Sequence, residues 1–103
     1  MNPSFFKKLG PININIIKKI INCDTENVSN EDYFNELVSL DNVSKNSLSF
    51  LYDNEKFKGD LPADVCIICS KSKKKLINPK QKLLIVKNVQ EAVSKLSNAF
   101  YRD

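Results

Sequence analysis

The sequence predicts a small α/β domain, in which a mixed sheet of four to five strands is flanked by helices. Two observations support this class. Residues 65–69 are apolar at every position, which is typical of a central strand buried on both faces. Short strand-like runs alternate with segments whose apolar residues recur at helical spacing. The chain has 103 residues, so we expect a single domain spanning residues 1–103.

The amino-terminal part of the chain predicts helices. Residues 1–10 are expected to form a short helical arm that is anchored by Phe5, Phe6 and Leu9 and ends at Gly10. Pro11 suits the first turn of a second helix, which we expect to continue to residue 21. Its apolar stripe consists of Ile12, Ile16, Ile17, Ile20 and Ile21. Residues 22–27 are polar and are expected to lead away from this helix.

The middle of the chain predicts strands joined by turns. The strands are expected at residues 33–40, 48–52, 65–69 and 83–86. Between the second and third of them, residues 54–61 could hold one short helix before Gly59 and Pro62 stop it. Residues 41–47 are expected to form a turn, and residues 70–81 a lysine-rich loop.

The last helix has the clearest pattern. Asn88 can cap it, and Glu91 three residues later completes a capping-box spacing. Its apolar stripe consists of Val89, Ala92, Val93, Leu96, Ala99 and Phe100.

The charge balance does not favour nucleic acid as the natural partner. The net charge is +4, but the chain has fifteen lysines and only one arginine, Arg102. Arginine is the preferred residue for bidentate contacts with phosphates and bases. The densest run, from Lys71 to Lys75, has two interpretations: a solvated loop, or a surface that attracts an acidic or phosphorylated partner.

Three cysteines are present: Cys23, Cys66 and Cys69. Cys66 and Cys69 have the C-x-x-C spacing of metal and redox sites. However, residues three apart in a strand point to opposite faces, so we interpret both as core residues and expect no metal. The odd count, with no secretory signal and no apolar segment long enough to span a membrane, predicts reduced thiols and a cytoplasmic location.

Catalysis is not expected of this chain. It lacks histidine, the commonest general acid or base, and has no P-loop or other glycine-rich nucleotide motif. We therefore predict no enzymatic activity and no cofactor.

An aromatic segment at residues 48–57 is the best candidate for a binding site. Phe50, Tyr52 and Phe57 offer flat faces, and the Asn54 amide can both donate and accept hydrogen bonds. A nucleobase is recognised by such a combination of a stacking plane and an edge reader. The alternative is that one or two of these aromatics belong to the core.

This segment, Ser49-Phe-Leu-Tyr-Asp-Asn-Glu-Lys-Phe57, resembles the S-F-L-x-N-P-K-Y signature of UDP-3-O-acylglucosamine N-acyltransferases of lipid A biosynthesis. The match is to their amino-terminal, uridine-binding domain. Phe5-Phe-Lys-Lys-Leu-Gly-Pro11, the stretch 40–50 and Lys82-Leu-Leu-Ile-Val-Lys-Asn88 resemble other parts of that domain in the same order. Relative to the signature, this chain has one extra residue before Asn54, and Phe57 in place of tyrosine.

The resemblance implies that the uracil of a UDP-sugar substrate lies between Phe50 and Phe57, with Asn54 on the base edge. Tyr52 is a further candidate uracil-binding residue. The resemblance also implies that this domain is non-catalytic. In the family, acyl transfer from acyl carrier protein belongs to a left-handed β-helix that also forms the homotrimer, so we expect this domain alone to be a monomer. Two other classes remain open: a basic nucleic-acid-binding module, and a protein-interaction domain without a small ligand.

Overall fold

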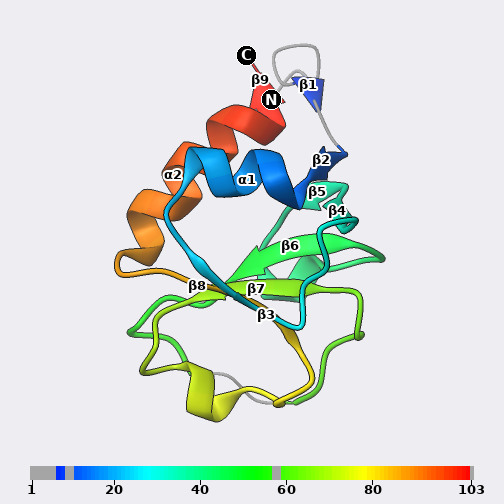
Figure 1. Ribbon diagram of the computed structural model, residues 1–103. Helices are drawn as coiled ribbons and strands as arrows, with labels where there is room; N and C mark the ends of the chain where they lie inside the picture. The colour runs from blue at the N-terminus through cyan, green and yellow to red at the C-terminus, as the bar shows by residue number, and fades with distance from the viewer. Residues whose placement is uncertain (1–6, 9–10, 57–58, 103) are drawn as a thin grey trace.

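The computed structural model of the chain describes residues 7–8, 11–56 and 59–102. A mixed five-stranded sheet with the strand order β3-β8-β7-β6-β5 forms its centre (Figure 1). The strands are β3 (Asp24–Glu26), β5 (Glu36–Leu37), β6 (Ser47–Phe50), β7 (Cys66–Cys69) and β8 (Lys82–Ile85). Strands β5 to β8 run parallel, and β3 is antiparallel to β8. The predicted α/β class with a mixed sheet is confirmed.

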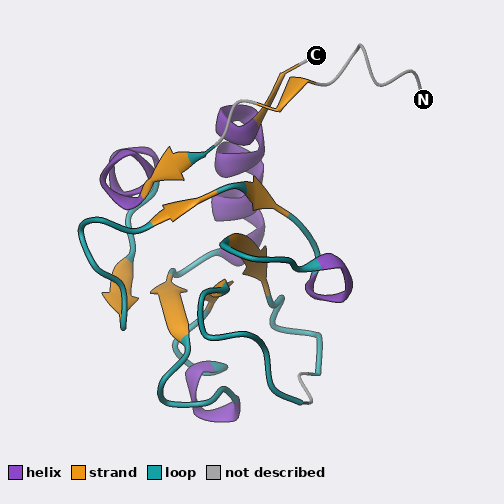
Figure 2. Cartoon of the chain, turned by 90° about the vertical axis from the view of Figure 1, so that its right-hand side faces the viewer, coloured by secondary structure: helices purple, strands orange, loops and turns teal. Residues whose placement is uncertain are grey.

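Both α-helices, α1 (Ile14–Ile20) and α2 (Val89–Phe100), cover the same face of the sheet. Figure 2 shows α1 end-on and α2 from the side. Ile17, Leu96 and Phe100 from the helices pack in one core with Leu48 and Ile68 from the sheet. On the opposite face, the loops before and after β7 cover a smaller core of Leu51, Ile67, Cys69, Ile77 and Leu83.

Strand β7 lies in the middle of the sheet and separates the two cores. Cys66 and Ile68 belong to the helix-side core, whereas Ile67 and Cys69 belong to the loop-side core. All four side chains have 0% exposure. The alternation confirms that this apolar run is a central strand and that its two cysteines point to opposite faces.

Helix α2 agrees with its sequence pattern. The Asn88 side-chain oxygen accepts a hydrogen bond from the Glu91 backbone N–H at 2.9 Å, which caps the first turn. Its buried residues are Val89, Ala92, Leu96 and Phe100.

Helix α1 begins later than predicted. Residues Ile12–Asn13 form strand β2, which pairs antiparallel with β4 (Tyr33–Phe34). Asn13 then caps the helix by accepting from Asn15 N at 2.8 Å. The helix therefore starts at Ile14, and Ile14, Ile17 and Ile21 become the buried stripe. The prediction that Ile16 is buried was wrong, because it is 51% exposed.

The strand predicted at residues 33–40 is divided at Asn35. Strand β4 pairs with β2, whereas β5 pairs parallel with β6. The Asn35 N–H donates to the Asn46 carbonyl at 2.9 Å, so the chain changes its pairing partner at this residue. Leu40–Asn42 form a 3₁₀ turn instead of the end of a strand.

Strand β3 was not predicted. Its residues, Asp24, Thr25 and Glu26, are polar and give no period-two alternation. They are held by antiparallel pairing with β8 at the edge of the sheet, where strands are partly solvated. Asn27 ends the strand with a φ of 59° and donates to the carbonyls of Pro79 and Gln81, both at 2.8 Å.

The predicted helical arm at residues 1–10 is wrong for Lys7–Lys8, which form strand β1. That strand pairs antiparallel with β9 (Tyr101–Arg102), so these two ends of the described chain lie together (Figure 1). Phe5, Phe6 and Leu9 lie outside the described residues. Beside this pair, the Tyr101 hydroxyl donates to the Leu37 carbonyl of β5 at 2.9 Å.

The short helix expected at residues 54–61 is not formed by the part of that segment that the structure describes. A turn stands there, closed by a hydrogen bond of 3.0 Å from Glu55 N to the Tyr52 carbonyl. Gly59 has a φ of 95°, which a glycine adopts without strain and which is incompatible with a helix.

Two fully buried serines of β6 should respond oppositely to substitution by alanine. Among the described residues, Ser49 Oγ has no hydrogen-bond partner, whereas Ser47 Oγ accepts from Ser44 N at 2.9 Å. Ser49→Ala should leave the free energy of unfolding unchanged or raise it by up to about 1 kcal/mol, while Ser47→Ala should lower it by about 1 kcal/mol. Urea unfolding of both variants measures the difference. Equal destabilisation by the two substitutions would contradict this account.

Candidate functional site

The carboxyl ends of β6, β7 and β8 meet at one edge of the sheet, because these strands are parallel neighbours. The chain after β6 and after β7 enters loops on the face away from the helices, whereas after β8 it passes to α2 on the helix face (Figure 1). In open α/β sheets, ligands bind in the crevice beyond the carboxyl ends of the strands. This edge is therefore the candidate site.

A cavity of about 340 Å³ opens at this edge. Tyr52, Asp53 and Asn54 line one side of it, from the turn that follows β6. The other side consists of residues 87–90, which connect β8 to the first turn of α2. Its volume is at the lower end of the range for pockets that hold small ligands.

Hydrogen bonds to the neighbouring loop hold the turn that follows β6. The Asp53 carboxylate accepts from Ser70 Oγ at 2.5 Å, and Lys73 Nζ donates to the Glu55 carbonyl at 2.8 Å. Within the turn, Tyr52 N donates to Glu55 Oε1 at 3.0 Å. Hydrogen bonds of the preceding residue, Asp53, and of the following residue, Glu55, therefore fix the position of Asn54.

Two of the four residues predicted to bind uracil, Tyr52 and Asn54, line the same cavity. Phe50 is not among the lining residues; its ring packs against Tyr52, with centroids 5.1 Å apart and planes tilted by 39°. Both rings are half-buried and pack on the helix-side core. The fourth residue, Phe57, lies outside the described residues.

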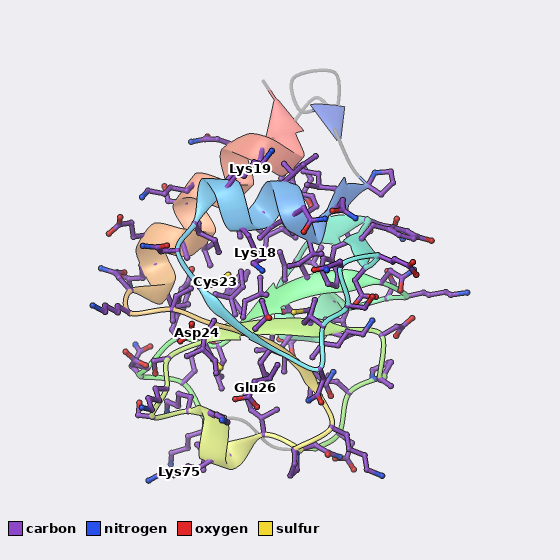
Figure 3. The ribbon with its side chains drawn as sticks, viewed as in Figure 1. Lys18, Lys19, Cys23, Asp24, Glu26 and Lys75 are labelled. Carbon is purple, nitrogen blue, oxygen red and sulfur yellow. The ribbon has the colours of Figure 1, made fainter. Side chains whose placement is uncertain are left out.

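A larger cavity of about 940 Å³ adjoins the first, and the two share Lys87 and Asn88. It lies between the carboxyl end of α1, the loop after β7 and the first turns of α2. Cys23 and Asp24, labelled in Figure 3, line it from the segment that follows α1. Its charged lining residues are Asp24, Lys71, Lys87, Glu91 and Lys95.

The lysine run 71–75 is divided among different roles. Lys73 binds the Glu55 carbonyl, and Lys74 forms an ion pair with Glu26 of β3. Lys71 lines the larger cavity, and Lys75 is exposed at the turn below the sheet (Figure 3). The run is therefore not one uniform surface.

The two strand cysteines are core residues. Burial raises the pKa of the Cys66 thiol well above its ordinary value, and burial together with the charges of Glu26 and Asp53 raises the pKa of Cys69 to about 11. Thiols with raised pKa values are poor metal ligands and poor nucleophiles near neutral pH. Across residues 11–56 and 59–102, no group of three or more potential ligands could hold a metal ion.

No family model and no curated protein matches the sequence. In the part of the chain that the structure describes, no helix is long and apolar enough to cross a membrane. The candidate site is thus defined by its own geometry.

Residues 87–90 were not predicted as part of the site: Asn88 was predicted only as a helix cap and Val89 only as part of the apolar stripe of the last helix. One signal could have identified them. Lys87 and Asn88 are the first polar residues after the predicted strand 83–86, as Ser70 and Lys71 are after the predicted strand 65–69. Polar residues after neighbouring parallel strands meet at one edge of a sheet.

The buried thiol of Cys69 should make stability decrease at alkaline pH. An unfolded cysteine ionises near pH 9.0, but the folded thiol stays protonated until about pH 11. The stabilisation that the protonated Cys69 thiol gives the folded state is fully present below pH 9. Between pH 9 and 11 it is lost, and the free energy of unfolding falls by at most about 1.4 kcal/mol per pH unit. Over this pH range the free energy of unfolding should decline less steeply in Cys69→Ala than in the wild type. Urea unfolding under reducing conditions measures the difference.

Ile67→Val is the matched control for this experiment. It truncates a neighbouring side chain of the same core and keeps the thiol, so it should lower stability without changing the pH dependence. If Cys69→Ala and the wild type decline in parallel, the thiol is not responsible.

Proposed function

We propose that this chain is a recognition domain that binds the uridine part of a UDP-sugar, in the cavity between Tyr52–Asn54 and residues 87–90. The proposal depends on one observation: the aromatic residue Tyr52 and the amide residue Asn54, both from the aromatic segment 48–57, line the same cavity. Asn54 is exposed, and its side chain has no hydrogen-bond partner among the described residues. Its amide is therefore available to a ligand.

In this proposal Tyr52 supplies the stacking face and Asn54 reads the base edge. Uracil presents an N–H donor between two carbonyl acceptors, and a side-chain amide can satisfy one donor and one acceptor at once. The Phe50 ring packs against the Tyr52 ring, with their centroids 5.1 Å apart, and holds it in place. Phe57 remains the candidate for the second face of the base.

The resemblance to the amino-terminal domain of the N-acyltransferases supports the same ligand. In that family the domain delivers the nucleotide end of the substrate to a separate catalytic domain. By this proposal the chain itself performs no acyl transfer, and acyl carrier protein would contact the catalytic domain. Stacking on one or two aromatics contributes about 1–3 kcal/mol per ring, so binding of free uridine should be weak, on the order of millimolar.

An NMR titration with uridine tests the proposal. Amide shifts should concentrate on residues 52–54 and 87–90, with a Kd on the order of millimolar. Asn54→Asp keeps the shape of the side chain but can only accept hydrogen bonds, so it should weaken uridine binding about three- to tenfold. Asn98→Asp makes the same change of charge at an exposed position outside both cavities and should leave the affinity unchanged.

Tyr52→Leu separates stacking from packing. Leucine retains apolar contact with the core but has no aromatic face, so uridine shifts should be lost while thermal unfolding changes little. A large loss of stability with retained uridine binding would show that Tyr52 is only a core residue. Absence of uridine shifts, or shifts confined to Lys74 and Lys75, would exclude the proposed site. Tight, strongly salt-dependent binding of arbitrary single-stranded DNA would identify a nucleic-acid-binding module instead.

A further inference from the structure

The two cavities adjoin at the short segment that connects β8 to α2. Lys87 and Asn88 line both the cavity of about 340 Å³ and the cavity of about 940 Å³. A ligand whose base occupies the smaller cavity would therefore have the rest of its structure directed along Lys87 towards the larger one. The chemistry of the larger cavity decides what that part of the ligand can be.

The lining of the larger cavity has three lysines and two acidic residues, an excess of one positive charge. Lys95 is paired with Glu91 at 3.0 Å, which neutralises both charges. Within the described chain, Lys71 and Lys87 have neither an ion-pair nor a hydrogen-bond partner, in contrast to Lys73, Lys74 and Lys82. Asp24 is the single acidic residue of the lining without a paired lysine. The unpaired charges of the described lining are therefore two ammonium groups and one carboxylate.

The positions of Lys71 and Lys87 follow from the sheet. Lys71 comes two residues after β7 and Lys87 two residues after β8, and these strands are paired from Cys66↔Lys82 to Cys69↔Ile85. The two lysines therefore leave the same edge of the sheet from adjacent strands. Ser70 and Ser72 also line the cavity beside Lys71.

We propose that Lys87 and Lys71 bind the phosphate groups of a nucleoside diphosphate, whose base occupies the smaller cavity. This inference rests on the proposed function and adds the residues that recognise the phosphates. Lys87, at the shared wall, contacts the phosphate nearer the ribose, and Lys71 contacts the next one. Ammonium groups act on phosphate as point charges, and their contribution depends on salt.

Binding of uridine, UMP and UDP to the whole chain tests this assignment. At low ionic strength UDP should bind about tenfold more tightly than uridine, with UMP between them, because each exposed ion pair adds a few-fold in affinity. Lys87→Gln should reduce the affinity for UDP about threefold, and the double variant Lys71→Gln/Lys87→Gln should remove most of the advantage of UDP over uridine. Lys71 lies outside the smaller cavity, so the single variant Lys71→Gln should leave the binding of uridine, which carries no charge, unchanged.

Lys80→Gln is the matched control, since it removes the same charge from an exposed position outside both cavities. Its affinity for UDP should equal that of the wild type. If uridine binds but UDP binds no more tightly, or if Lys80→Gln weakens UDP as much as Lys87→Gln does, the phosphate assignment is wrong and the base site stands. If neither uridine nor UDP binds, the proposed function itself fails.

Pyrophosphate alone separates a phosphate site from general attraction. It should perturb the amides of residues 71 and 87 and compete with UDP but not with uridine. Shifts spread over all surface lysines would show only the positive net charge of the chain and would overturn the assignment.

Discussion

The burial of β7 on both faces is the constraint on which the rest of the structure depends. Its four side chains have 0% exposure, so the sheet needs a layer of helices above it and a layer of loops below it. Pairing with β6 and β8 places three carboxyl ends side by side. The turn at Tyr52–Glu55, the loop at Ser70–Lys73 and the start of α2 must therefore emerge together, and the candidate site consists of these three segments.

Strongly patterned elements were predictable, and elements that depend on a distant partner were not. Strands β7 and β8 and helix α2 have apolar patterns that leave little choice of structure. Asp24–Glu26 have no such pattern and become a strand only because β8 lies beside them. Asn35 divides a continuous strand pattern because its two halves pair with different partners, β2 and β6. At such positions, pairing with a strand that is distant in the sequence overrides the intrinsic secondary-structure propensity of the residues.

The candidate site shows the same division. The aromatic segment was selected from Phe50, Tyr52, Phe57 and Asn54, a combination that predicts base recognition, and two of these residues, Tyr52 and Asn54, line the cavity. Lys87 and Asn88 lie more than thirty residues further along the chain, and only the parallel order of the strands brings them to the same cavity. The sequence alone also could not show that Phe50 packs against the Tyr52 ring and lies outside the lining of this cavity.

The hydrogen bond from the Tyr101 hydroxyl to the Leu37 carbonyl has a consequence for how the molecule can meet other proteins. A sheet can be lengthened by a foreign strand only where an edge has free backbone groups. At the β5 edge, one of those groups is already occupied by a side chain from the other end of the chain. At the opposite edge, β3 is three residues long and carries two carboxylates. Strand addition is thus disfavoured at both edges of this sheet, which leaves its loop-bearing end as the surface best suited to recognition.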